Sequence, residues 1–162
     1  MKRLITAVLL TACCLITSTS LRAQGYTNAI GLRLGTSSGI TFKHSLGNDA
    51  MLELMLTSRW HGWTFTGLYE KHAPAFQVDK LYWYYGAGAH AGFWNGNHHH
   101  PWYDDENHGD HFEIGVDGII GLEYQITEIP FNVGIDWKPA FNIAEYTGLW
   151  ADEFALSFRY TF

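Results

Sequence analysis

The chain closes with Ala155-Leu156-Ser157-Phe158-Arg159-Tyr160-Thr161-Phe162, and this stretch decides the fold. In an extended strand, successive side chains point to opposite faces. One face of this strand therefore carries only apolar and aromatic side chains, namely Leu156, Phe158, Tyr160 and Phe162. Ser157, Arg159 and Thr161 lie on the other face. An unpaired edge this apolar would invite aggregation, so we expect the strand to be paired on both edges, as it is in a closed barrel.

The first 23 residues have the organisation of a secretory signal peptide. Lys2 and Arg3 precede a short apolar run, and Leu21-Arg22-Ala23 offers a cleavage site. We therefore divide the chain into a signal peptide at 1–23, which is removed, and one barrel domain at 24–162. Lipidation of Cys13 is an alternative, because Leu10-Thr11-Ala12-Cys13 resembles the lipobox of bacterial lipoproteins.

Cleavage at this site would change the charge and the cysteine content of the chain. Both cysteines lie in the signal, so the exported domain has none and no disulfide can stabilise it. Seven basic and sixteen acidic residues remain, which gives a formal charge of −9. This acidic balance argues against nucleic acid as a partner.

Strand-like alternation covers nearly all of residues 24–162, interrupted by turn residues. Eight runs are predicted, at about 29–35, 40–43, 52–57, 64–70, 81–94, 114–125, 131–138 and 155–162. Irregular segments are expected at 95–112 and at about 139–151. The fold class is therefore all-β, an eight-stranded antiparallel up-and-down transmembrane β-barrel. An even number of strands is typical of single-chain bacterial membrane barrels.

The same alternation would suit a soluble barrel, in which the apolar face points inward. Two features favour the membrane orientation. The apolar faces carry no charge at the strand centres, and Trp83, Tyr85, Trp137 and Tyr160 lie towards strand ends, as an interfacial aromatic girdle requires.

The polar faces then line the barrel interior. The ten charged residues predicted there are Arg33, Lys43, Arg59, Lys138, Arg159, Glu53, Glu70, Asp117, Glu123 and Asp136. An eight-stranded interior is only wide enough for side chains to fill it. Five bases facing five acids thus predict a plug of ion pairs rather than a water-filled channel.

Three segments resemble the small outer-membrane β-barrel proteins of Gram-negative envelopes, which are similar in architecture to the OmpA transmembrane domain and OmpX. They are Asn28–Gly35, Gly39–His44 and Pro130–Pro139. The resemblance implies export to the bacterial outer membrane, contact with its lipids and eight strands. It implies no catalytic residue. The closing strand also resembles the assembly signal of such barrels, which implies recognition of Phe158, Tyr160 and Phe162 by the barrel-assembly machinery.

The segment 95–112 is the one stretch that is rich in potential metal ligands. Imidazole and carboxylate groups suit Zn²⁺, Cu²⁺ or Ni²⁺, and the candidate ligands are His98, His100, His108, Asp110 and His111. The alternative is a solvated external loop that binds no cofactor, since a metal site needs three or four converging ligands.

Two further functions are alternatives to a structural role. A lipid-A-modifying enzyme would need a nucleophile beside a base; His44-Ser45 is the nearest such pair, and His61 and His90 have no adjacent Ser. Recognition of a glycan or a protein would use the aromatic side chains of the external loops. We therefore expect a non-enzymatic, monomeric barrel with a structural or surface-interaction role.

Overall fold

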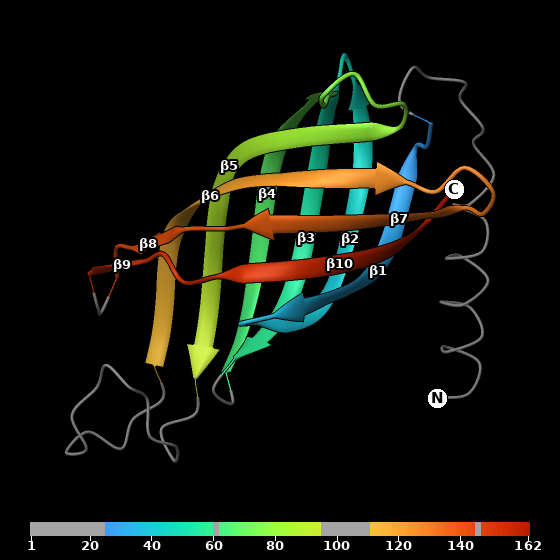
Figure 1. Cartoon of the computed structure of the whole chain (residues 1–162). Coiled ribbons are helices and arrows are strands. Elements are labelled where there is room, and N and C mark those ends of the chain that lie inside the picture. The colour runs from blue at the N-terminus through green and yellow to red at the C-terminus, as the bar shows by residue number, and fades with distance from the viewer. Residues whose placement is uncertain (1–24, 60–61, 95–110, 145–146) are drawn as a thin grey trace, which may run out of the picture.

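A computed structural model of the chain describes residues 25–59, 62–94, 111–144 and 147–162. Within these ranges the chain forms a closed antiparallel β-barrel (Figure 1). Its strands are β1 Asn28–Gly35, β2 Ser38–Gly47, β3 Ala50–Arg59, β4 Gly62–Pro74, β5 Leu81–Trp94, β6 His111–Gln125, β7 Phe131–Trp137, β8 Ala140–Asn142, β9 Gly148–Trp150 and β10 Phe154–Thr161.

The closing strand pairs on both edges, as predicted. On one side Leu156 of β10 lies opposite Leu34 of β1, and on the other side it lies opposite Ile135 of β7. A second contact, between β5 and β6, joins the two halves of the sheet. The sheet therefore has no free edge along its main strands, which is how a barrel avoids edge-to-edge aggregation.

Ten segments make eight barrel strands, because β7 with β8 forms one strand and β9 with β10 forms another. Trp137 lies opposite Ile120, and Ala140 lies opposite Asp117, so the register against β6 is unchanged across the break. The break falls at Pro139, which has no backbone N–H to donate. Its carbonyl still accepts a hydrogen bond from the Gly118 N–H at 2.8 Å.

The prediction of an irregular segment over 139–151 is therefore wrong, because the irregular part is shorter. β8 and β9 occupy its two ends and pair with each other from Ala140↔Trp150 to Asn142↔Gly148. Sequence alternation over three residues is too short to distinguish a strand from a loop, which is why this hairpin was missed.

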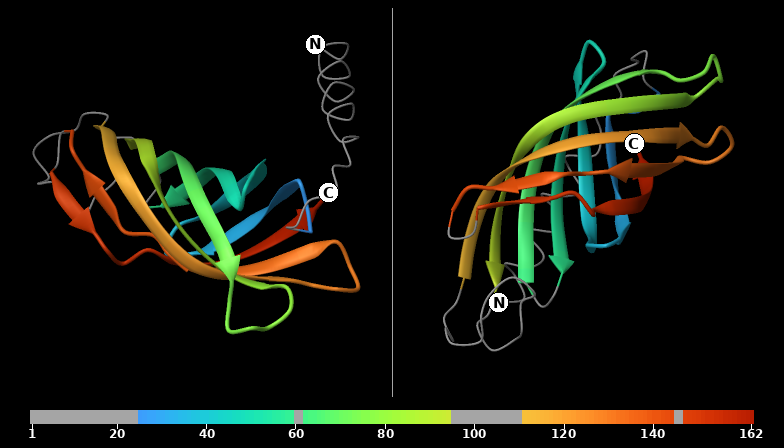
Figure 2. Two further views of the ribbon diagram at one scale, coloured as in Figure 1. Left: turned by 90° about the horizontal axis from the view of Figure 1, so that it is seen from above. Right: turned by 60° about the vertical axis from the view of Figure 1, so that its left-hand side comes forward.

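The turns explain how the strands reverse at one end of the barrel. Asn48 and Asp49 connect β2 to β3 with φ values of 52° and 59°, the left-handed conformation that two-residue hairpins require. In Figure 1 the β4–β5 and β6–β7 turns lie at the end that also holds the C-terminus, whereas β8 and β9 lie at the opposite end. Both views in Figure 2 show β5 and β6 bending strongly along their length.

The alternation of burial matches the predicted orientation. Along β10 the residues from Phe154 to Thr161 are exposed and buried in strict turn, with Arg159 buried and Phe158 exposed. The same holds for β7, where Asn132 and Asp136 are buried and Ile135 is exposed. The polar faces thus fill the interior and the apolar faces form the outer wall. No helix in the described part of the chain is long and apolar enough to cross a membrane.

Candidate functional site

The barrel interior is the candidate site, because its buried residues are mostly polar and charged. The buried bases in the described ranges are Arg33, Lys43, Lys138 and Arg159, and the buried acids are Glu53, Glu70, Glu113, Asp117, Glu123, Asp136 and Glu153. An uncompensated ion in such a space costs several kcal/mol, so the contacts between these groups decide whether the interior is stable.

Glu53 and Arg159 form the centre of one cluster. The Arg159 Nη2 atom donates to Glu53 Oε1 at 2.7 Å, and its Nη1 atom lies 3.4 Å from Glu123 Oε2. Thr41 donates a further hydrogen bond to Glu53. Lys43 joins the same cluster, with its Nζ atom 2.7 Å from Glu70 Oε2 and 3.5 Å from both Glu53 and Glu123. Each of these two cations is therefore shared among several carboxylates contributed by different strands.

A second cluster lies around Asp136 and Lys138. Arg33 pairs with Asp136 at 2.7 Å, and the Tyr84 hydroxyl donates to the same carboxylate at 3.1 Å. Lys138 contacts Asp117 at 2.8 Å and Glu153 at 3.1 Å. Arg33 also lies 3.5 Å from Glu153, which connects the two halves of this cluster.

Tyr84 links the two clusters through the middle of the barrel. It is fully buried and packs with Met55, Leu68 and Ile119 in a small apolar core. The Lys43 ammonium lies 3.9 Å from the centroid of its ring, a favourable cation–π distance. The side chain therefore fills space, while its ring face contacts a cation of one cluster and its hydroxyl contacts a carboxylate of the other.

His90 is held between acceptors on both ring nitrogens. Its Nδ1 atom lies 2.8 Å from Asp117 Oδ2, and its Nε2 atom lies 2.9 Å from Asn142 Oδ1 and 3.3 Å from Glu113 Oε1. Its ring lies against Gly115, where a Cβ atom would stand 2.5 Å from the imidazole Cε1. These contacts identify His90 as part of the packed interior rather than as a base beside a hydroxyl.

Aromatic side chains lie at both ends of the described interior. At the end that holds the C-terminus, the Tyr26 hydroxyl donates to Glu123 at 2.5 Å. The cavity between Tyr26, Met51 and His72 measures only about 10 Å³, which is about the volume that one water requires. At the other end Trp94 covers Gly62 and Gly92, where a Cβ atom would stand within 2.3 Å of the indole, and it meets Trp150 edge-on at 6.2 Å.

The predicted interior charges can now be placed one by one. Nine of the ten are buried in the two clusters, but Arg59 is not among them. It pairs with Asp152 at 2.7 Å at the rim, where the side chains are 11% and 63% exposed. The hydrogen bonds from Arg59 hold the pKa of the Asp152 carboxyl below its ordinary value.

The predicted equality of five bases and five acids is wrong for the described interior. Four buried bases face seven buried acids, because Glu113 and Glu153 are additional to the prediction and Arg59 lies at the rim. Glu113 has the inward parity of β6 and stands one position before the predicted run, so a longer run would have included it. Glu153 lies between the predicted irregular segment and the predicted closing strand, and it shares the inward parity of Ala155, Ser157 and Arg159, so a closing run that began two residues earlier would have included it.

The candidate catalytic pair His44-Ser45 is separated by the strand itself. The two residues are neighbours on β2, so their side chains lie on opposite faces. His44 Nδ1 contacts Asn28 Oδ1 at 2.8 Å, whereas Ser45 is buried and its hydroxyl accepts a hydrogen bond from the Gly47 N–H at 3.4 Å. His61, the third candidate base, lies outside the described residues.

The predicted metal ligands cannot be placed. His98, His100, His108 and Asp110 lie outside the described residues, and only the backbone of His111 is described, as the start of β6. Among the residues that the structure does describe, no group of three or more His, Cys, Asp or Glu side chains is positioned to hold a metal ion.

The residues of the predicted assembly signal lie on the outer wall. Phe158 and Tyr160 are exposed, and Phe131 of β7 stacks on Phe158 with ring centroids 4.8 Å apart. Tyr160 stacks in turn on Phe162 at 5.9 Å. The closing strand thus presents a continuous row of aromatic rings at the end of the barrel that holds the C-terminus.

These features define the class: an all-β, eight-stranded closed antiparallel barrel with a polar interior and an apolar outer wall. The N-terminal β-barrel domain of Pseudomonas aeruginosa OprF, known from a crystal structure, has a similar fold. The TM-score is 0.64 with 17% sequence identity, and the match covers 83% of this chain and 96% of that one. This supports the predicted likeness to small barrels of the OmpA type at the level of the fold. No protein-family model and no curated protein sequence matches the chain.

Proposed function

We propose that the chain is an integral barrel of the bacterial outer membrane whose interior is closed to ions and which carries its longer connections at the cell surface. The observation that carries this proposal is the pairing of buried charges inside a wall that is apolar outside. The OprF-like fold supports the location, and the signal-like segment at 1–23 supports export. The terminal row of Phe158, Tyr160 and Phe162 supports recognition by the barrel-assembly machinery.

The height of the apolar wall supports the membrane placement. Outward side chains of β5 are aromatic at both ends, with Trp83 and Tyr85 near one end and Phe93 near the other. The ten residue-to-residue steps from Trp83 to Phe93 extend ~34 Å along the strand, which a tilt of ~40° reduces to ~26 Å. That height agrees with the apolar band of ~25 Å on membrane barrels.

The packing of charged side chains in the interior argues against ion conduction through the barrel. Lys43 and Arg159 each contact two or more carboxylates, and Tyr84 fills the space between the clusters. An ion entering this space would have to displace several of these pairs, each of which is already desolvated. The barrel would therefore act as an anchor, with outer-membrane lipids as its immediate partners and with its external connections free to contact a glycan or a protein.

Planar-bilayer recording on the inserted protein tests the closed interior. We expect no steady single-channel current across the wild-type barrel. Insertion must be demonstrated on the same sample, for example by quenching of tryptophan fluorescence with brominated lipids, so that absent current is not confused with absent protein. A stable conductance from inserted wild-type protein would contradict the proposal.

We also propose that the barrel is monomeric and is not an enzyme. The placement of His44 and Ser45 on opposite faces supports the second part. Metal binding by the segment 95–112 stays a separate proposal that rests on the sequence alone. Zn²⁺ calorimetry on the folded protein tests it, with His98, His100, His108 and His111 replaced by Asn as the comparison; equal heats from both proteins would dismiss it.

A further inference from the structure

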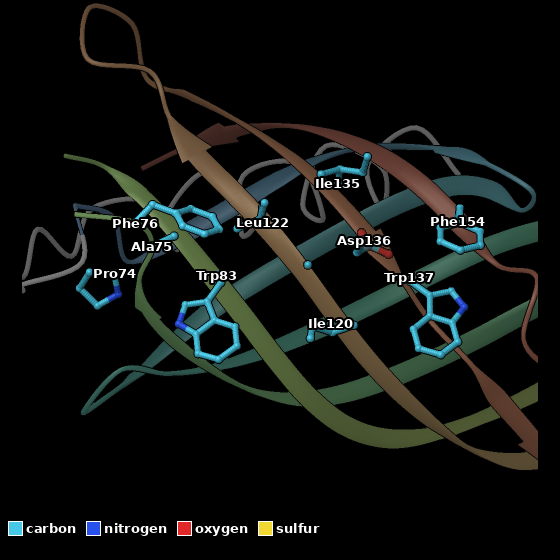
Figure 3. A pocket seen from close by; sticks show the side chains of 11 residues that line it. Pro74, Ala75, Phe76, Trp83, Ile120, Leu122, Ile135, Asp136, Trp137 and Phe154 are labelled. Atoms are coloured by element: carbon cyan, nitrogen blue, oxygen red, sulfur yellow. The ribbon is translucent and has the colours of Figure 1, made fainter. Parts of the chain in front are cut away.

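An apolar groove of about 660 Å³ runs across the outer wall (Figure 3). Phe76 and Trp83 stand at one end of it, and Trp137 and Phe154 stand at the other. Trp137 and Phe154 are stacked, with ring centroids 6.2 Å apart. The groove is therefore a trough between two aromatic ends rather than a uniform part of the wall.

Aliphatic side chains line the middle of this trough. Ile120 and Leu122 come from β6 and Ile135 comes from β7, and Figure 3 shows them between the two aromatic ends. Gly121 lies between the first two on β6 and contributes no side chain to the floor. A flexible hydrocarbon chain matches such a lining, because apolar contact is its only requirement.

Phe76 projects over the groove from a tight turn. Its φ is 52°, and Gln77 and Lys80 in the same turn have φ values of 58° and 62°. The Val78 N–H donates to the Ala75 carbonyl at 3.0 Å, so a two-residue turn sets the left-handed backbone of Phe76 and Gln77. The Phe76 side chain is 80% exposed, and it therefore leaves apolar surface open to a bound chain at this end of the groove.

The turn that carries Phe76 also carries one acidic and one basic side chain. Asp79 and Lys80 are adjacent and exposed, and they lie at the end of the barrel that holds the C-terminus. In the membrane orientation of the proposed function, this end faces the periplasm. A headgroup with a phosphate and an ammonium would find a partner for each of its charges there.

We infer that this groove binds one acyl chain of a zwitterionic phospholipid from the periplasmic leaflet, with its headgroup beside Asp79 and Lys80. This inference rests on the proposed membrane placement. It differs from general lipid contact because it assigns one groove and one lipid rather than the whole wall. The bound lipid would exchange more slowly than the lipids around the rest of the barrel.

Native mass spectrometry of the detergent-solubilised barrel, titrated with phosphatidylethanolamine, tests this site. Ile120→Trp would fill the groove, and Val116→Trp is the matched control, because Val116 is exposed on the same strand but lies outside the groove. We expect the wild type and the control each to retain one lipid. Ile120→Trp should retain it about tenfold more weakly, because keeping two methylene groups of the acyl chain out of the groove is enough to weaken binding by that factor. Phosphatidylglycerol should be retained more weakly than phosphatidylethanolamine.

Equal retention by the two Trp variants, or no retention by the wild type, would overturn the assignment of the groove. Equal retention of the two lipids would overturn the headgroup assignment. Insertion of each protein into brominated-lipid vesicles is measured in parallel by tryptophan quenching. A protein that fails to insert contradicts the proposed membrane function, whereas an inserted protein without a bound lipid contradicts only the groove.

Discussion

Arg159 and Glu53 are separated by 106 positions in the chain, yet the guanidinium Nη2 atom donates to the Glu53 carboxylate at 2.7 Å inside the barrel. Both side chains are fully buried. Arg159 comes from the closing strand β10 and Glu53 from β3, and β1 and β2 lie between these two strands in the sheet. The pair therefore spans the interior, and it exists only when the barrel is closed.

Removal of one partner of this pair should be costly. Arg159→Met would remove the closest cation from Glu53 and leave Lys43, at 3.5 Å, as the remaining described cation beside Glu53 and Glu123. Breaking a buried pair in this way costs about 3–5 kcal/mol. We expect that loss in the free energy of unfolding, measured by denaturant titration in lipid vesicles. The double variant Glu53→Gln/Arg159→Met should recover much of it, because the uncompensated charge on Glu53 is then gone. A single variant that unfolds like the wild type would show that the pair contributes little.

Substitutions on the two faces of β7 should differ strongly. Ile135 points outward, and Ile135→Arg should cost about 2–4 kcal/mol near the bilayer midplane. Asn132 points inward, and no hydrogen-bond partner is found for its side-chain amide among the described residues. Asn132→Ser should therefore cost less than about 1 kcal/mol, since no hydrogen bond is lost. Equal losses in vesicle unfolding titrations would argue against the assigned orientation.

Gly88 and Gly67 offer a matched test of how closely β4 and β5 approach each other. A Cβ atom on Gly88 would stand 1.9 Å from the Gly67 carbonyl oxygen, whereas one on Gly67 would meet only Leu54 Cδ2 at 3.7 Å. Gly88→Ala should destabilise by about 1–3 kcal/mol through overpacking. Gly67→Ala should be neutral or stabilising by up to about 1 kcal/mol, because it restricts the unfolded chain. Comparable unfolding midpoints for the two variants would contradict this geometry.

The rim pair of Arg59 and Asp152 should give a small stability term that depends on pH. Hydrogen bonding from Arg59 lowers the pKa of Asp152 from its ordinary value of 3.8. The contribution of this pair to the free energy of unfolding is therefore fully present above pH 3.8. It is lost as the pH falls through the lower pKa that Asp152 has in the folded state. Because Asp152 is largely exposed, Asp152→Asn should cost no more than about 1 kcal/mol at neutral pH. The variant and the wild type should converge in acid; a gap that widens there would refute this assignment.

The alternation in the sequence was sufficient to predict most of the wall. Ile135 and Phe158 were placed outside, and Asp136 and Arg159 inside, because the side-chain period of a strand is two and one apolar face is enough to set the parity of the run. The same alternation failed where the runs are short or interrupted. β8 and β9 have three residues each. The break at Pro139 hides the continuity of β8 with β7, and the break at 151–153 hides that of β9 with β10.

The interior was predicted by composition but not by contacts. Lys43 was expected to pair, yet nothing in the sequence indicates that Glu70, Glu53 and Glu123 would surround it. These contacts depend on the register between strands and on the closure of the barrel, which brings together residues that are far apart in the chain. The displacement of Arg59 to the rim has the same cause, since the height of a residue along the barrel axis follows from the strand register and not from the parity of its side chain.

By itself, then, the sequence determined the strands, their inward and outward faces and the pairing of the closing strand on both edges, because those properties follow from local alternation and from the cost of an exposed apolar edge. Only the tertiary structure decided that four bases meet seven acids in the interior, that Tyr84 bridges the two clusters and that Phe76 stands over a groove on the outer wall. Each of these depends on distances between strands that no local pattern encodes.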